Sequence, residues 1–256
     1  MIPIFSGIAS RKEYELLDAA GVTHCLADQF DLANVPEGRA NVTLDCGAYK
    51  LSKKGRQVEV KPYIRVADSR EFFMRIAPDV LGDPEATLRN WKAVRRCDVP
   101  FVPVYQWGAP RSHLLYYLDE SEVVAIGGLV SIMREKETKE QQKARERMLK
   151  ELSGICAEFK GRIHVCGCNW LKAADRIKEH AYSYDSAKWI SSAGKGRVIF
   201  PNVSKSRPFL ALAPQKLVKV NGVAIYAGLD REGRAILNAR NIEEYFSGVR
   251  GEAKAA

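Results

Sequence analysis

Four residues that could do chemistry each end a short apolar run of the chain. They are Asp45 after NVTL, Asp79 after FMRIAP, Gln106 after FVPVY and Asp185 after AYSY. Paired carboxylates suit bond making and breaking at an anomeric carbon, because one can attack or stabilise the oxocarbenium ion while another moves protons. The same residues would also suit metal-assisted hydrolysis or base recognition. Any one of these acids could instead be a helix cap or a turn residue, but their repetition at successive run ends favours a shared site.

Eight short apolar runs are the elements that must position these residues. They cover residues 2–5, 24–27, 41–47, 73–80, 101–106, 123–130, 162–168 and 181–186, and we interpret them as strands buried on both faces. Helical spacing lies between several of them, at 11–20, 84–97, 134–160 and 170–180. This alternation predicts a parallel sheet with helical crossovers.

The number of strands favours closure of the sheet. About eight strands, with no glycine-rich nucleotide-binding loop in the sequence, predict an α/β fold of the (β/α)8 TIM-like barrel type and disfavour an open doubly wound sheet. In such a barrel the active site forms at the carboxyl ends of the strands. We therefore expect the four run-end residues to meet at one end of the barrel.

The chain length fits one barrel domain over residues 1–256, with a core at about 1–200. A hairpin around Asn221-Gly222 and a final helix over NIEEYFSGV are expected at about 201–250, followed by a frayed tail at 251–256. The mixed-charge helix at 134–160 fits a solvated outer helix, with a phosphate-contacting face as the alternative.

Composition narrows the class of protein and its partners. The formal net charge is +9, with 40 Lys and Arg against 31 Asp and Glu, which favours a polyanionic partner such as nucleic acid. No run approaches the roughly 20 apolar residues needed to cross a bilayer, and the first residues lack the pattern of a signal peptide. We therefore expect a cytoplasmic protein without a membrane partner, whose six cysteines are reduced.

Four motifs, taken in order, resemble a known family. They are LDCGAY at 44–49, VYQWG at 104–108, AIGGLV at 125–130 and YDSAKW at 184–189. Over roughly residues 41–190 their order and spacing resemble the tRNA-guanine transglycosylase superfamily, in the short phage-type branch that modifies DNA. The resemblance implies exchange of a guanine base in nucleic acid for a 7-deazaguanine, with no cofactor and, for a phage protein, in the host cytoplasm.

The resemblance also implies roles for the strand-end residues. Asp185 would attack C1′ of the target nucleoside as a covalent nucleophile, and Asp45 would assist proton transfer on the departing and incoming bases. Asp79 would accept hydrogen bonds from the base, Gln106 would donate to its O6, and the Gly127, Gly128 and Leu129 segment would contact its 7-substituent. Asp45 and Asp79 could exchange duties without any visible change in the sequence.

Two further groups of residues are expected around the base and the phosphates. Tyr105, Trp107 and Tyr49 are candidates to stack on the base, although an aromatic beside an apolar strand is more often part of a core. Basic residues in loops after the strands would hold flanking phosphates once the nucleotide has left its stack. This group comprises Lys50, Lys53, Lys54, Arg56, Lys188, Lys195, Arg197, Lys205 and Arg207.

The chain departs from the superfamily in two places. No cysteine follows Cys168, so the C-terminal zinc-binding subdomain of the tRNA enzymes is absent, and this favours DNA over tRNA as the substrate. We interpret His164, Cys166 and Cys168 as core residues and predict no metal site. Cys46 stands where the family has serine, which puts the hydrogen bond of that serine in doubt.

Three other functions stay open at this point. The chain could be a tRNA-guanine transglycosylase, or a metal-assisted small-molecule enzyme with Asp45, Asp79 and Asp185 as oxygen ligands. It could also be a catalytically silent nucleic-acid-binding partner of another enzyme. Its oligomeric state, and the particular 7-deazaguanine, do not follow from the sequence.

Overall fold

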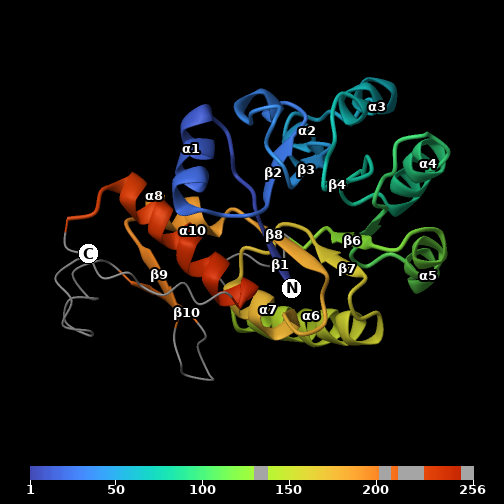
Figure 1. The fold of residues 1–256 in the computed structure, drawn as a ribbon. Helices are drawn as coiled ribbons and strands as arrows, with labels where there is room; N and C mark the ends of the chain where they lie inside the picture. Colours follow the sequence, from blue (N-terminus) through green and yellow to red (C-terminus); the bar gives the residue numbers. More distant parts are fainter. Residues whose placement is uncertain (130–137, 202–208, 213–227, 249–256) are drawn as a thin grey trace.

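The computed structural model describes residues 1–129, 138–201, 209–212 and 228–248 (Figure 1). Among these residues, no helix has the length and apolar character needed to cross a bilayer. Strands lie at the centre and helices surround them (Figure 1).

Eight parallel strands form the central sheet. They are β1 (Ile2–Phe5), β2 (Cys25–Asp28), β3 (Val42–Asp45), β4 (Met74–Arg75), β5 (Val104–Gln106), β6 (Val124–Gly127), β7 (Ile163–Val165) and β8 (Ser183–Ser186). Their order is β4-β3-β2-β1-β8-β7-β6-β5, so β4 and β5 are the two ends of the sheet. A parallel bridge between Ile76 and Val102 joins these ends, where Val102 N donates to Arg75 O (2.7 Å) and Ala77 N donates to Val102 O (2.9 Å). The predicted TIM-like (β/α)8 architecture is confirmed.

Helices follow the strands around the barrel. They are α1 (Arg11–Ala20), η1 (Leu32–Asn34), α2 (Ala48–Ser52), α3 (Val60–Asp68), α4 (Pro84–Val94), α5 (Arg111–Glu120), α6 (Lys139–Glu158), α7 (Leu171–Ile177) and α8 (Lys188–Gly194). Local sequence explains several starts: the Ser10 and Asp83 side chains cap α1 and α4, and Thr138 forms a capping box with Gln141 at α6.

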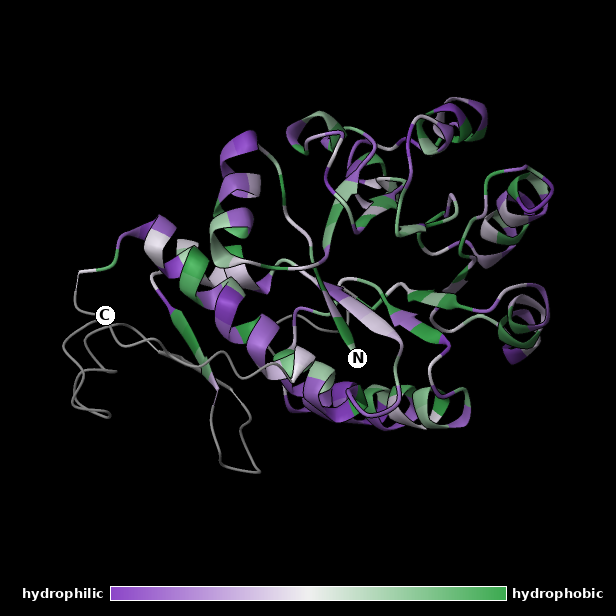
Figure 2. Ribbon diagram, viewed as in Figure 1, coloured by the Kyte–Doolittle hydropathy of each residue, from purple (hydrophilic) through white to green (hydrophobic). Residues whose placement is uncertain are grey.

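The four expected helices are confirmed, with shorter bounds for three of them. The sequence did not predict α2, α3, α5 or α8. In α5 the buried residues Leu114 and Leu118 are adjoined by Leu115, which is 43% exposed, so the apolar stripe is blurred. In α3 a proline at position 62 weakens the helical pattern, although it lies in the first turn, where a missing N–H is tolerated. The first half of α6 is exposed and its second half packs inward (Figure 2).

The barrel interior is apolar in one part and polar in another. Ile76, Val104 and Ala125 form a small cluster of their own, with Val102 and Cys166 packed against it. Polar side chains on β3, β7 and β8 are fully buried, namely Thr43, His164 and Ser183. Consequently β8, whose residues are Ser-Tyr-Asp-Ser, is among the more polar strands (Figure 2).

The C-terminal part adds a strand pair and a long helix to the barrel. β9 (Val198–Pro201) pairs antiparallel with β10 (Phe209–Leu212), and α10 (Arg231–Ser247) packs against α1, α8 and β9. Asn238 is fully buried in this contact; it donates to Trp189 O and Arg197 O and accepts from Ile199 N.

The C-terminal expectations were partly wrong. The final helix begins ten residues earlier than the predicted Asn241, because Asp230 caps it and accepts from Gly233 N. The strands β9 and β10 were not predicted, and the expected hairpin around Asn221-Gly222 lies outside the described residues.

Candidate functional site

One end of the barrel gathers the four strand-end residues of interest, and we call it the mouth. Asp45 ends β3, Gln106 ends β5, Asp185 is next to last in β8, and Asp79 lies in the segment after β4. Burial raises the pKa of Asp45 most, and the negative charges of Asp79 and Asp185 raise it further, in keeping with three carboxylates at the carboxyl ends of the strands of one barrel. The structure therefore brings together the residues that the sequence predicted to share a site, while their roles stay predictions.

Asp45 is half-buried and is held by the turn that follows β3. Its Oδ2 accepts a hydrogen bond from Gly47 N (3.3 Å). Burial, and then the charges of Asp79, Asp185 and Asp28, raise the pKa of Asp45 to about 7. Near neutral pH this carboxyl group is therefore present in both its protonated and its ionised form, as a group that transfers protons in both directions requires.

Both oxygens of the buried Asp79 are engaged by neighbouring side chains. Cys46 Sγ donates to Oδ1 (3.3 Å), and Gln106 Nε2 donates to Oδ2 (2.6 Å). Burial raises the pKa of Asp79, and these two hydrogen bonds oppose that shift. Burial also raises the pKa of the Cys46 thiol well above its ordinary value, so the thiol stays protonated and acts as a donor. Cys46 thus supports Asp79.

Gly127, which ends β6, and Gly128, which follows it, make room for this pair. A Cβ on Gly127 would lie 3.0 Å from Val104 Cγ1 and 3.5 Å from Gln106 Nε2. Gly128 has φ +81°, and a Cβ there would lie 3.2 Å from Gln106 Oε1. Side chains larger than hydrogen would therefore displace Gln106 or strain the backbone.

Asp185 is 7% exposed and is held through one oxygen. Its Oδ1 accepts from Gly167 N (2.8 Å) and lies 3.5 Å from His164 Nε2. Among the described residues no hydrogen bond reaches its Oδ2. One carboxylate oxygen is thus anchored while the other stays available.

The rest of the YDSAKW segment fixes the end of β8. Ser186 Oγ donates to Asn169 Oδ1 (3.0 Å) and accepts from Lys188 N (3.1 Å). The fully buried Trp189 donates from Nε1 to Ser6 O (2.7 Å), which ties α8 to the loop after β1. These contacts fix the end of the strand that carries Asp185.

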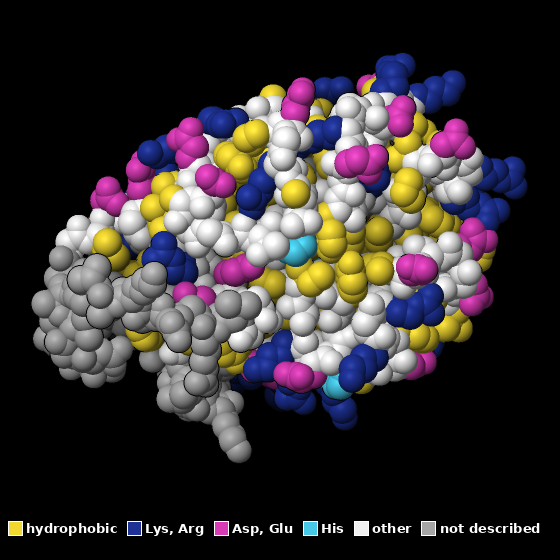
Figure 3. All heavy atoms as spheres, in the orientation of Figure 1, with side chains coloured by type: hydrophobic (Ala, Val, Ile, Leu, Met, Phe, Trp, Pro, Cys, Tyr) yellow, Lys and Arg dark blue, Asp and Glu magenta, His cyan; other side chains and the backbone are white. Residues whose placement is uncertain are grey.

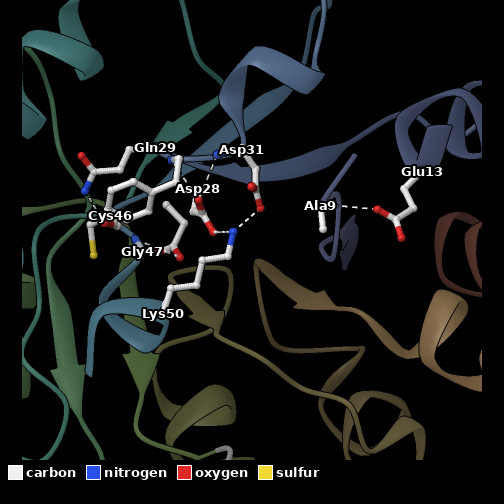
Figure 4. Close-up of polar contacts among 10 residues, drawn as sticks. Ala9, Glu13, Asp28, Gln29, Asp31, Cys46, Gly47 and Lys50 are labelled. Carbon is white, nitrogen blue, oxygen red and sulfur yellow. Dashed lines mark hydrogen bonds and ion pairs between the residues drawn. The ribbon is translucent and has the colours of Figure 1, made fainter. Parts of the chain in front are cut away.

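A network of polar and charged residues, which the sequence did not indicate, links the loops after β2 and β3 (Figure 4). Asp28 ends β2 directly opposite Asp45 in the parallel register. Lys50 Nζ lies between Asp28 Oδ2 (2.8 Å) and the carboxylate of Asp31. Gln29 Nε2 donates to Cys46 O (2.5 Å) and so ties this loop to the one after β3. Asp28 also ends a strand, so extending the run 24–27 by one residue would have identified it.

The predicted aromatic and apolar contacts fall in different places. Tyr105 is not brought to the mouth: strand alternation turns it away from Gln106, it is 7% exposed in the main core, and its hydroxyl donates to Ala109 O (2.7 Å). Trp107 is partly buried and Leu129 fully buried. Tyr49, on α2, is 42% exposed, with Lys53 Nζ 4.2 Å from its ring centroid.

The predicted phosphate contacts do not form one group. Lys53, Lys54 and Arg56 are exposed in the turn after α2, on the mouth side of β3, whereas Lys50 faces two carboxylates. Lys188 begins α8 just beyond β8, but Lys195 and Arg197 lie at the other end of that helix, about 10 Å along its axis.

Lys205 and Arg207 lie outside the described residues. On the face shown in Figure 3, basic and acidic side chains are interspersed around the rim. The net positive charge of the chain is therefore not gathered into a single patch on that face. The phosphate-contacting roles of the Lys and Arg residues stay predictions.

Comparisons with known proteins name no family for this chain. No protein-family model and no curated protein matches it. Among solved structures, one from Aquifex aeolicus VF5, described only as a structural study, aligns with 96% of this chain and 93% of its own, at 10% identity and a TM-score of 0.47. The architecture given above therefore rests on the strand pairing itself, and the resemblance to the transglycosylase superfamily stays a prediction.

Proposed function

We propose that this protein exchanges a guanine base in nucleic acid, with DNA as the preferred polymer, for a 7-deazaguanine. The observation that carries the proposal is the pairing of two different carboxylates at the mouth. Asp185 keeps one oxygen available for attack, and Asp45 has a pKa of about 7. Double displacement at an anomeric carbon requires one nucleophilic carboxylate and one group that gives and takes a proton.

In the first step Asp185 Oδ2 attacks C1′ of the target nucleoside, and the bond from C1′ to N9 of guanine breaks. The departing base takes the bonding electrons and receives a proton from Asp45. In the second step Asp45 removes the N9 proton of the incoming 7-deazaguanine, whose nitrogen attacks C1′ and displaces Asp185. The two steps leave both carboxyl groups in their starting states.

Asp79 and Gln106 suit recognition of the base edge. The Nε2 of Gln106 carries two hydrogens, so one can stay on Asp79 while the other donates to O6 of the base. Each oxygen of Asp79 can accept a second hydrogen bond, from N1–H or from the exocyclic amine. The target nucleotide must leave its stack, or arrive single-stranded, for C1′ to reach Asp185.

The competing site of three carboxylates around a metal ion is less well supported. Among the described residues, the group of ligand atoms close enough to share one ion consists of His164, Cys166 and Asp185, and neither Asp45 nor Asp79 belongs to it.

The test is nucleoside mass spectrometry of DNA and of tRNA after incubation with the protein and a 7-deazaguanine base. We expect the modified nucleoside in DNA with the wild-type protein and none with Asp185→Ala. Asp119→Asn, which changes an exposed acid on α5, is the matched control and should behave as wild type. Modification of tRNA alone would refute the choice of DNA, and no modification of either polymer would refute base exchange.

A further inference from the structure

A second group of polar atoms lies beside Asp185, on the strands β7 and β8. His164 is on β7, Cys166 is the first residue after it, and Asp185 is on β8. One ligand atom from each side chain lies within 4.8 Å of the other two. Residues two apart on a strand point to the same face, so His164 and Cys166 share the side from which they meet Asp185.

The contact between His164 and Asp185 is not an ordinary hydrogen bond. His164 Nε2 lies 3.5 Å from Asp185 Oδ1, and His164 is 0% exposed. Among the described residues Nε2 has no hydrogen-bond partner, although a buried polar atom is normally paired. The unpaired nitrogen is therefore an independent sign that something else binds between these groups.

The separation of the two atoms fits shared coordination of one ion. Zinc binds imidazole nitrogen at about 2.0–2.1 Å and carboxylate oxygen at about 2.0–2.2 Å, so tetrahedral ligands of these types lie about 3.3–3.5 Å apart. The observed 3.5 Å agrees with that spacing. On its other side the ring is oriented by Ser183 Oγ, 2.9 Å from Nδ1, which is the kind of outer contact that metal-binding histidines commonly have.

We propose that His164, Cys166 and Asp185 bind one zinc-class transition-metal ion, with a fourth position left open toward the mouth. The mixture of one imidazole, one thiolate and one carboxylate favours Zn²⁺ over Mg²⁺ or Ca²⁺, which prefer ligand sets made of oxygen alone. Three protein ligands with an open position are typical of zinc sites that bind a water molecule or a substrate. The site differs from the three-carboxylate arrangement considered above, and from the all-core interpretation of His164 and Cys166.

Charge at the mouth favours a cation at this place. Besides burial, the negative charges of Asp79 and Asp185 raise the pKa of Asp45, so several carboxylates act on one another at the mouth. A divalent ion would offset this repulsion, and the Cys166 thiol would release its proton to solvent as the sulfur binds. The proposed metal site does not depend on base exchange, because it rests on the ligand atoms and on the charge around them.

Binding of the ion would also compete with attack by Asp185, since both uses draw on the same carboxylate. An Asp185 bound to metal is a weaker nucleophile, because its charge is shared with the cation. Zinc would therefore slow covalent chemistry at C1′ if the protein carries out base exchange. If it does not, the open position would instead activate water.

The experiment titrates the full-length protein, stripped of metal by a chelator, with Zn²⁺ and separately with Co²⁺. We expect one saturable equivalent, and a thiolate-to-cobalt charge-transfer absorption band in the Co²⁺ form. Cys166→Ser should lose the band, and His164→Asn should weaken Zn²⁺ binding more than the about 10- to 100-fold expected for Ser183→Ala, which removes the outer contact. Cys97→Ser, which changes a partly buried thiol far along the chain, should leave both signals unchanged.

Circular dichroism of each metal-free variant checks that it is folded before binding is compared. The proposal is overturned if the wild-type protein binds no stoichiometric Zn²⁺. It is also overturned if folded Cys166→Ser and His164→Asn bind as tightly as wild type. Because these readouts measure binding, failure of the metal site and failure of base exchange are distinguishable.

Discussion

The two carboxylates Asp79 and Asp185, on opposite sides of the mouth, differ in how far their oxygens are paired within the protein. On the side formed by β3 to β6, both oxygens of Asp79 accept hydrogen bonds, and Gly127 leaves the space in which Gln106 reaches it. On the side formed by β7 and β8, Oδ2 of Asp185 and Nε2 of His164 have no hydrogen-bond partner among the described residues.

This difference indicates that the two carboxylates have different roles, one in recognising a ligand and the other in making a bond. Groups already held in place can recognise a ligand without rearrangement, because the free energy of ordering them was lost in folding. A buried atom left unpaired, such as His164 Nε2, costs stability, which proteins generally tolerate where that atom makes or coordinates a bond. We therefore assign base recognition to Asp79 and Gln106, and nucleophilic attack to Asp185 on the β7–β8 side, with Asp45 at the end of β3 transferring the proton.

Asp185→Asn should have the largest effect on base exchange. The amide keeps an oxygen for Gly167 N but cannot act as an anionic nucleophile, so the rate should fall by about 10³-fold or more, with little change in unfolding temperature. Rates from labelled guanine incorporation, together with a denaturing gel for the covalent adduct, check this. Retention of an adduct in Asp185→Asn would place the nucleophile elsewhere.

Asp45→Asn should have the next largest effect and should change the pH profile. Loss of a proton-transferring group costs about 10²- to 10⁴-fold in rate. Because the pKa of Asp45 is about 7, the wild-type rate should vary with pH around neutrality, and this dependence should disappear in the variant. If the rate of Asp45→Asn still changes with pH near 7, the proton transfer belongs to another group, with Asp79 the first candidate.

Gln106→Leu should weaken base recognition without abolishing chemistry. Asp79 would lose the donor at 2.6 Å while staying buried, so the free energy of unfolding should fall by about 1 to 3 kcal/mol. We expect KM for the base to rise more than kcat falls, because a binding contact is lost. Urea denaturation and steady-state kinetics measure the two effects, and an equal fall in kcat would assign Gln106 to bond making instead.

The stability of the protein should also depend on pH through Asp45. Its folded pKa of about 7 exceeds the roughly 3.9 of an unfolded aspartate, so the folded state binds the proton more tightly. The stabilisation that comes from binding this proton is complete below about pH 4 and is lost as the pH rises through 7. Between pH 5 and 8 the free energy of unfolding of the wild type should therefore fall by on the order of 1 to 2 kcal/mol more than that of Asp45→Asn, after allowance for partial exposure of the carboxyl group. Urea denaturation of both proteins at the two pH values measures this, and an equal change in both proteins would contradict the raised pKa.

The sequence predicted the barrel and the mouth because both follow from short-range patterns. Apolar runs alternate with helical spacing, and polar residues at run ends must meet in a parallel barrel. The pairing of His164 with Asp185 has no such local signal. It depends on the register of β7 against β8, in which His164 lies opposite Ser183, two residues before Asp185.

The C-terminal part was harder to predict for a different physical reason. Its contacts are polar and long-range. Asn238 and Asn241 form hydrogen bonds with the backbone of Ile199 on β9, which lies 39 and 42 residues earlier in the chain. An asparagine in a helix gives no periodic apolar signal, so the residues that fix α10 on β9 resemble surface residues in the sequence.

The smallest expected effect concerns the basic residues and tests which side receives the nucleic acid. Lys53 and Lys54 are exposed beside β3, and their replacement by Gln should weaken DNA binding severalfold. The slope of log affinity against log salt should become shallower by up to about 2, since each phosphate contact contributes roughly 0.9.

Lys195→Gln combined with Arg197→Gln is the matched control. It removes the same charge at the far end of α8, about 10 Å along the helix from Lys188, and should leave the salt slope nearly unchanged. If this pair carries the loss instead, the polymer lies over β9 and α10 and approaches the mouth from the β8 side. The backbone of the nucleic acid would then pass Asp185 before it reaches Asp79 and Gln106. The target nucleotide would meet the nucleophile first and the base-recognition residues second, which is the reverse of the order expected for entry beside β3.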